Sequence, residues 1–312
     1  MIKILYIYDF EDWALHNVGR YWAGLIKDYA RFTFSQLGHH EKFNPCDFDF
    51  ILWGCSYMAE RYLTRLIYSI FPRHAPLWNH SLNKHFITII HDPCEIFPEK
   101  RNWYMCKPRR LDKIRTFAKI GVISKEMHNI MREIGFECSI INTNSTLPLQ
   151  DLEKLTLEPL KIFSRARNRP RKNLNLFKSL QATLQSSCSV FNGYFENNLL
   201  PIDEYIQLID SHNCYICTSW QEGGPLPLMD AMRRGCVVLT TPVGQTDELI
   251  QDGVTGYFCN NYDEFKKRIV WLSTHPDILL KMRKQALLAV SKRSDLRVRK
   301  QLIDFLNTDV LL

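Results

Sequence analysis

Residues 214–240 read CYICTSWQEGGPLPLMDAMRRGCVVLT, and this stretch decides the fold. It opens with an apolar run at 214–219, passes through Glu222 and a Gly-Gly-Pro turn, and closes with a second apolar run at 236–240. The segment between them, 226–234, has the apolar spacing of a helix that covers a sheet. Strand, covering helix and second strand are typical of a parallel sheet, in which ligands bind at the carboxyl ends of the strands.

The same alternation runs along most of the chain. Further apolar, strand-like runs lie at 3–8, 48–54, 85–91, 120–124, 138–142, 160–164 and 188–191. Helical patterns lie at 18–29, 57–70, 125–135, 173–185, 202–211, 263–272 and 276–307. Two prolines and weak periodicity at 143–160 predict a linker. We therefore expect two doubly wound α/β domains, 1–150 and 151–295, and a C-terminal helix in 296–312 that packs back toward the first domain.

The composition is that of an ordinary globular protein, with 46% hydrophobic and 23% charged residues. No run approaches the roughly 18 apolar residues of a membrane-spanning helix. The first residues, MIKILYIYDFEDWALH, predict a buried strand and not a signal peptide. We expect a cytoplasmic protein, with peripheral attachment to a membrane surface left open.

Two stretches concentrate the formal net charge of +7. Residues 100–119 and 161–178 are both rich in Lys and Arg and nearly free of acids. Such runs are usually solvated helix faces, but two of them also suit a polyanionic partner. The sequence leaves open whether that partner is a phosphate group, a nucleic acid or an anionic membrane that carries a lipid-linked acceptor.

The turn after the run at 214–219 combines three features that suit a nucleotide sugar. Glu222 follows the strand, and the turn Gly223-Gly224-Pro225 lets a ligand approach the backbone closely. Amides at the helix start near Leu226 favour an anion. Asp230, one turn into the helix, can accept hydrogen bonds from a diol such as a ribose.

These residues also resemble a known family. Glu222 and Asp230 have the spacing of the E-x7-E motif of glycosyltransferase family 4, which has the GT-B fold. The continuation to Phe258 is similar to the rest of that family's donor-domain signature, and Arg167 with Lys172 is similar to its Arg, five residues, Lys pattern. The resemblance implies two Rossmann-like domains that face each other across a cleft.

The resemblance further implies roles for individual residues. Arg167 and Lys172 would hold the donor diphosphate, and Glu222 would face the donor sugar. Residues of the donor site would be Gly223, Gly224, Pro225, Leu226, Asp230 and Gly244. The chain departs from the family in having Asp230 where Glu is usual and Asn173 where Gly is common. Because Arg and Lys neutralise the diphosphate, the reaction needs no metal, and no cofactor is expected besides a UDP-type or GDP-type donor sugar.

In the first half, the resemblance implies residues near the acceptor and the reacting sugar. His91 would be catalytic, with Asp92 beside it on the acceptor side, at the end of the strand 85–91. His16, on the acceptor side, and Gly19, on the donor side, would lie in the loop after the first strand.

The sequence therefore predicts a retaining glycosyltransferase that moves a hexose or pentose from a nucleoside diphosphate sugar to an acceptor hydroxyl. A glycan, a lipid-linked group and a nucleic-acid base remain open as acceptors. Two alternatives remain: a nucleotide-sugar epimerase or hydrolase of the same fold, and a nucleic-acid-binding protein that uses the basic stretches. The oligomeric state is left open.

Overall fold

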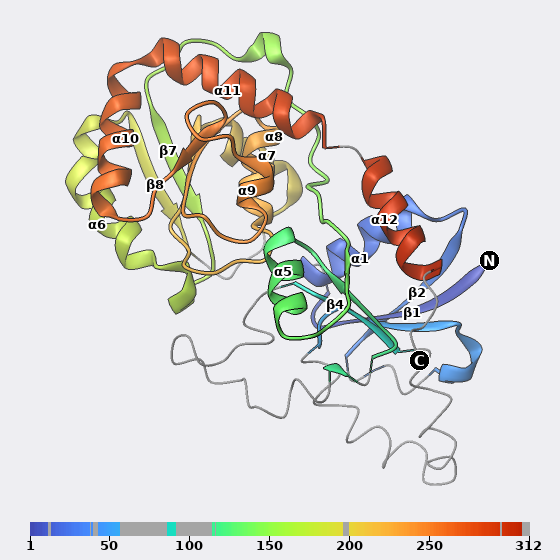
Figure 1. Cartoon of the computed structure of the whole chain (residues 1–312). Helices are drawn as coiled ribbons and strands as arrows, with labels where there is room; N and C mark the ends of the chain where they lie inside the picture. Colours follow the sequence, from blue (N-terminus) through green and yellow to red (C-terminus); the bar gives the residue numbers. More distant parts are fainter. Residues whose placement is uncertain are drawn as a thin grey trace. The chain divides into compact units, whose positions relative to one another are not determined.

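The computed structural model describes residues 1–11, 14–37, 39, 43–56, 86–91, 114–115, 117–195, 200–293 and 295–307. The chain divides into two compact units (Figure 1). The first contains Met1–Thr143 and Asp295–Leu312, and the second contains Asn144–Ser294. The sequence placed the boundaries at residues 150 and 295, so the first boundary lies several residues earlier than expected.

The first unit is built on a parallel sheet with the strand order β2-β1-β3-β4-β5-β6. Its strands are β1 (Ile2–Tyr8), β2 (Ala30–Gln36), β3 (Phe50–Trp53), β4 (Phe86–Ile90), β5 (Lys119–Val122) and β6 (Ser139–Ile140). In the register of the central strands, Tyr6 pairs with Phe34 on one side and Leu52 on the other. β1 and β4 are almost wholly buried, as expected for parallel strands covered on both faces.

Helices from distant parts of the sequence cover this sheet. They are α1 (Ala14–Leu25), α5 (Lys125–Glu133) and α12 (Asp295–Asn307). Figure 1 shows α12, from the end of the chain, beside α1, and Arg299 forms an ion pair with Asp28 at 2.7 Å. The C-terminal helix therefore belongs to the first unit.

The second unit has a parallel sheet with the strand order β11-β10-β9-β7-β8. Its strands are β7 (Lys161–Arg165), β8 (Val190–Tyr194), β9 (Cys214–Cys217), β10 (Val237–Thr240) and β11 (Gly256–Phe258). The order reverses beside β7 and β9, because β7 pairs with both β8 and β9. Loops after these strands therefore meet at one edge, where ligands bind in open α/β sheets.

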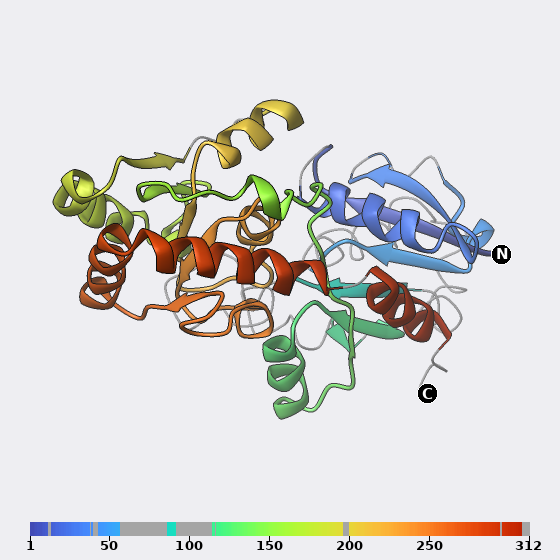
Figure 2. The same cartoon turned by 90° about the horizontal axis from the view of Figure 1, so that it is seen from above.

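Alternate residues of these strands enter two separate cores. Ile162 and Ile216 pack with α6 (Leu174–Leu184), α10 (Tyr262–Thr274) and the start of α11 (Pro276–Ser291). Phe163 and Tyr215 pack on the other face, with α7 (Ile202–Asp210), α8 (Leu226–Arg233) and the end of α11. Figure 2 shows the length of α11, in orange-red, along this unit.

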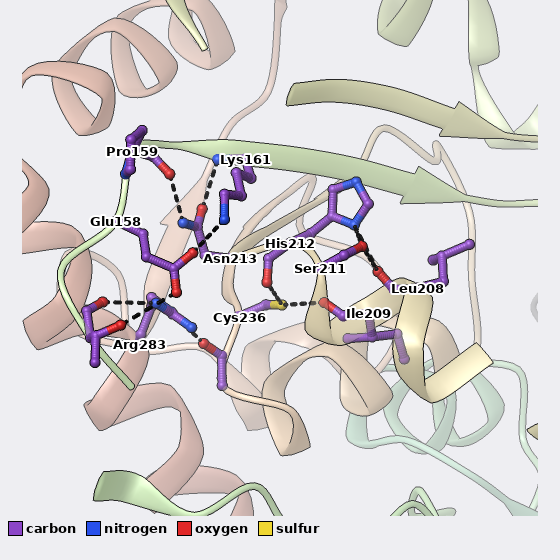
Figure 3. Close-up of polar contacts among 12 residues, drawn as sticks. Glu158, Pro159, Lys161, Leu208, Ile209, Ser211, His212, Asn213, Cys236 and Arg283 are labelled. Atoms are coloured by element: carbon purple, nitrogen blue, oxygen red, sulfur yellow. Dashed lines mark hydrogen bonds and ion pairs between the residues drawn. The ribbon is translucent and has the colours of Figure 1, made fainter. Parts of the chain in front are cut away.

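Polar side chains stabilise the amino ends of the strands in the second unit (Figure 3). Asn213, just before β9, accepts a hydrogen bond from the Lys161 amide and donates to the Pro159 carbonyl, both at 2.8 Å. Buried Arg283 donates from Nε to the Gly235 carbonyl at 2.8 Å. Because these groups satisfy one another, we interpret this cluster as structural.

The two predicted α/β units are confirmed, with some differences in their elements. The sequence analysis missed β2 and β11, and the first helix begins at Ala14 and not near residue 18. A short α9 (Thr246–Leu249) follows β10. The helix predicted at 57–70 lies outside the described residues. Among the helices that the structure describes, none has the length and apolar character needed to cross a membrane.

Candidate functional site

Three loops of the second unit meet at the carboxyl ends of its central strands. We call them the basic loop (166–173, after β7), the acidic turn (218–225, after β9) and the glycine turn (243–246, after β10). The Trp220 amide donates to the Arg171 carbonyl at 2.7 Å, which joins the acidic turn to the basic loop. The Gln245 amide donates to the Gly223 carbonyl at 2.9 Å, which joins the glycine turn to the acidic turn.

Glu222 lies at the centre of this arrangement with its carboxylate buried. Lys172 Nζ donates to Oε1 and Arg171 Nη1 donates to Oε2 at 3.1 Å. Ser219 Oγ also donates to Oε1, at 2.7 Å. Burial alone would raise the pKa of Glu222, but the charges of Lys172 and Arg171 more than offset this and lower it. The site therefore holds an ionised carboxylate between two cations.

The backbone of the basic loop turns sharply to bring both cations to Glu222. Pro170–Lys172 form a single turn of 3-10 helix, and Asn173 follows with φ +49° and ψ +47°. This left-handed conformation favours glycine, and asparagine tolerates it better than most other residues. The conformation accounts for an asparagine at this position. Thr218 Oγ1 fixes the turn by donating to the Lys172 carbonyl at 3.0 Å.

Gly244 allows the glycine turn to approach the acidic turn. Its φ is +58°, and a Cβ built there would lie 2.6 Å from the Glu222 carbonyl oxygen and closer still to that of Gly223. Only glycine fits both the conformation and the space. Gly244 therefore lies directly against the carbonyl groups of Glu222 and Gly223.

The start of α8 matches the sequence prediction, because the helix begins at Leu226 directly after Pro225. Gly223 and Pro225 are buried and Gly224 is partly buried, so the backbone of the acidic turn is enclosed. The first amides of α8 lie next to the Glu222 cluster in sequence, where the helix dipole favours a negative group.

Asp230 lies on α8, one turn from the acidic turn, and two hydroxyl groups hold it. Ser145 Oγ donates to Oδ1 at 2.5 Å, and Tyr205 OH donates to Oδ2 at 2.9 Å. The Arg165 guanidinium lies 4.5 Å from the centre of the Tyr205 ring. Burial raises the pKa of Asp230 to about 6, although both hydrogen bonds act to lower it. Each oxygen keeps a lone pair, so a diol could still bind.

Of the two predicted phosphate-binding residues, Lys172 contacts Glu222. Arg171 joins it there, and Arg167 lies earlier in the basic loop, partly buried. The sequence analysis missed Arg171, because three other arginines, at positions 165, 167 and 169, closely precede it. The sequence contained one usable signal: Pro170 predicts a turn that would point its neighbours away from the strand direction.

The predicted loop position of His16 and Gly19 is wrong, because both residues lie in α1. His16 is buried and stacks on Tyr8, with 4.2 Å between ring centres. A Cβ on Gly19 would lie 2.6 Å from Cζ of Tyr6. The glycine is therefore explained by close contact between α1 and β1.

His91 directly follows β4, as predicted from the sequence, and its ring lies beside that of Trp22 at 5.8 Å between centres. Burial lowers the pKa of His91 to about 4, and a backbone hydrogen bond to Gly54 acts in the opposite direction. His91 is therefore uncharged near neutral pH. Asp92 lies outside the described residues.

The chain is similar to known proteins in part of its sequence and in its fold. Residues 199–288 match the family model described as "Glycosyl transferases group 1". The matched segment contains the acidic turn, α8 and the glycine turn. No curated protein sequence matches the chain.

Solved structures resemble the chain over nearly its whole length. HepE of Anabaena, solved with UDP and glucose, has a TM-score of 0.65 at 13% identity, covering 98% of this chain and 99% of that one. A glycosyltransferase of Rickettsia africae has a TM-score of 0.64 at 13% identity, covering 97% of both chains. TarM of S. aureus has a TM-score of 0.59 at 13% identity, covering 83% of this chain and 55% of that one. At these identities the likeness establishes the fold: the chain has the two-domain, Rossmann-like GT-B fold and contains a glycosyl transferases group 1 domain.

Proposed function

We propose that this protein transfers a sugar from a nucleoside diphosphate sugar to an acceptor hydroxyl, with retention of configuration at the anomeric carbon. One observation carries the proposal: the Glu222 carboxylate is buried between Lys172 and Arg171 at the carboxyl end of β9. Two cations and one carboxylate leave a net positive charge in a site with little water. Such a site stabilises the negative charge that develops on a leaving diphosphate.

Each loop then has a role in donor binding. Arg167, Arg171 and Lys172 of the basic loop bind the diphosphate, and Glu222 faces the sugar hydroxyls. The turn Gly223–Leu226 and Gly244 supply backbone contacts to the donor. Asp230 accepts hydrogen bonds from the ribose. Because the cations neutralise the diphosphate, we propose that no metal ion is needed.

The first unit would supply the acceptor side. His91, uncharged near neutral pH, can donate or accept a hydrogen bond at the reacting sugar or the acceptor. We also assign Asp92, the residue after His91, to the acceptor side. Complexes of HepE with UDP-glucose and of pneumococcal GtfA with UDP and GlcNAc support a UDP-type hexose donor.

A thermal-shift panel tests the donor site. UDP, GDP, ADP and dTDP sugars and CMP sugars are each added with and without EDTA. One diphosphate class at 100 times its dissociation constant should stabilise the wild type by about 2.7 kcal/mol with or without EDTA. Lys172→Met and Arg171→Met should lose this shift because each removes a cation from the diphosphate. Arg169→Met, an exposed arginine of the same loop, is the matched control and should keep it.

Three results would contradict the proposal. The first is that no nucleotide sugar raises the melting temperature of the wild type. The second is that the rise in melting temperature needs a metal ion. The third is that Arg169→Met abolishes this rise as fully as Lys172→Met does. Release of free or altered sugar without an acceptor would instead indicate a hydrolase or an epimerase of the same fold. Salt-sensitive nucleic-acid binding without any nucleotide shift would indicate a nucleic-acid-binding protein.

A further inference from the structure

Both ends of the second unit bond to the candidate site. This unit begins at Asn144 and ends at Ser294, so the backbone joins it to the first unit at these two ends. Residues at each end make side-chain hydrogen bonds that lead to Glu222 or Asp230. Donor binding by the three loops does not by itself require these hydrogen bonds.

At the first end, Ser145 holds Asp230. Its hydroxyl donates to Asp230 Oδ1 at 2.5 Å and accepts from the Leu147 amide at 3.2 Å. Ser145 is 4% exposed, so water competes little for these bonds. The orientation of the Asp230 carboxylate therefore depends on the backbone at residues 145–147.

At the other end, Arg293 holds the glycine turn. Arg293 Nη2 donates to Oε1 of Gln245, which is wholly buried. The Gln245 amide donates in turn to the Gly223 carbonyl at 2.9 Å. A guanidinium is a rigid planar donor, so moving Arg293 displaces its acceptor or breaks the bond. The position of the residue next to Glu222 therefore depends on the end of the second unit.

Asn144 joins the two ends. Its Nδ2 donates to the Arg293 carbonyl at 3.1 Å, and its Oδ1 accepts from the Ser145 amide at 3.1 Å. One continuous series of hydrogen bonds results, through Asp230, Ser145, Asn144, Arg293, Gln245 and Gly223.

We propose that Arg293 and Ser145 are positioning residues. They couple the backbone conformation at the two ends of the second unit to the geometry of the donor site. A contiguous hydrogen-bond network can carry such coupling between distant groups. The effect on donor binding rests on the proposed function, but the coupling itself does not. By reciprocity, a ligand that fixes the acidic turn and Asp230 also favours one conformation at both ends of the unit.

Hydrogen–deuterium exchange of the full-length chain without ligand tests the coupling directly. Arg293→Met should speed exchange in the acidic and glycine turns by about tenfold, which corresponds to the loss of one charge-assisted hydrogen bond. The core of β10, Val237–Thr240, should keep its wild-type rate. Arg293→Lys should restore part of the protection, because it keeps a cationic donor. Lys292→Met, its exposed neighbour, is the control and should change neither segment.

The alternatives give different patterns. If Arg293 only stabilises the unit as a whole, β10 and both turns speed up together and Arg293→Lys gives no selective rescue. If the turns keep their wild-type rates in Arg293→Met, there is no coupling. Either pattern overturns the inference.

Donor titration then separates this inference from the proposed function. Arg293→Met and Ser145→Ala should each raise the dissociation constant of the stabilising nucleotide sugar, and the double variant should raise it by a factor different from the product of the two. An exact product would overturn coupling through Asn144. If wild type binds no nucleotide sugar while the exchange pattern holds, the proposed function fails and the coupling stands.

Discussion

Two hydroxyl groups hold the carboxyl of Asp230, and this arrangement determines the pH at which its charge is lost. Burial disfavours the carboxylate and raises the pKa to about 6, whereas Ser145 and Tyr205 act to lower it. Asp is shorter than Glu by one methylene, so these donors hold a carboxylate that reaches less far than a glutamate at position 230 would. The ionised carboxylate is a stronger hydrogen-bond acceptor for a hydroxyl group than the protonated carboxyl.

We predict that donor binding weakens as the pH falls through about 6. Each further pH unit should weaken it by about tenfold if the protonated form does not bind. Tyr205→Phe removes a bond that lowers the pKa of Asp230, so the midpoint should move to higher pH. Calorimetric titration with an intact nucleotide sugar measures this, because its diphosphate carries no group that titrates in this range.

Asp230→Asn is the control and should give a flat profile over the same range. Protonation of Asp230 does not unfold the protein, so unfolding caused by this group cannot explain weaker donor binding at low pH. A raised carboxyl pKa means that the folded state holds the proton more tightly, so this group favours folding more as the pH falls from about 6 toward 3.8. A wild-type profile as flat as that of Asp230→Asn would contradict the assignment to the ribose.

The residue scale also shows what the sequence could predict about the site. Glu222, Lys172 and Asp230 were predicted as site residues from a resemblance in motif spacing, and the structure places Glu222 and Lys172 in contact. Arg171 was missed because its direction depends on the turn at 170–172 and on the left-handed Asn173. Such backbone dihedrals follow from contacts with Thr218 and Trp220, some 45 residues away in the chain. Local patterns do not contain that information.

At the scale of elements, buried central strands were predictable and edge strands were not. β9 and β10 are continuous apolar runs that are buried on both faces. β2 lies at an edge of its sheet and most of its residues are only partly buried, and β11 has three residues only. α1 begins at Ala14, four residues earlier than predicted. The formation of these edge strands depends on pairing with neighbouring strands and on tertiary contacts, which a local sequence pattern does not show.

The glycine turn provides a prediction at this scale. Gly244→Ala should destabilise the second unit by about 2–4 kcal/mol, because it combines left-handed strain with a backbone clash. Gly253→Ala, at φ +74° with its nearest neighbour 3.9 Å away, carries the strain without the clash and should cost about 1 kcal/mol. Denaturant unfolding measures both. Equal costs would mean that the acidic turn moves aside easily and that the three loops are not tightly joined.

At the scale of the whole molecule, the chain leaves the first unit and returns to it. α12 packs on α1 and β6 through Val298, Leu302, Phe305 and Leu306, all buried. Arg299 reaches Asp28 and Tyr21 reaches Asp295 at 2.7 Å. The first unit therefore includes α12 as part of its fold. The second unit is joined to the first unit by the backbone at both of its ends.

This arrangement predicts that a core substitution in α12 destabilises only the first unit. Leu302→Ala removes a side chain that is 2% exposed and should cost about 2–5 kcal/mol. Exchange should speed up in β1, α1 and β4, while β9, α8 and β10 keep their wild-type rates. The control is Lys300→Ala, whose exposed ion pair with Asp304 should contribute under about 1 kcal/mol to stability.

Two outcomes would contradict this prediction. Equally faster hydrogen exchange in both sheets would show that the two units unfold as one. Faster exchange in the second unit alone would contradict the assignment of α12. Under the predicted outcome the nucleotide-sugar affinity stays within about twofold of wild type, since every donor-binding residue that we propose in the second unit lies on loops or on α8, which Leu302 does not support.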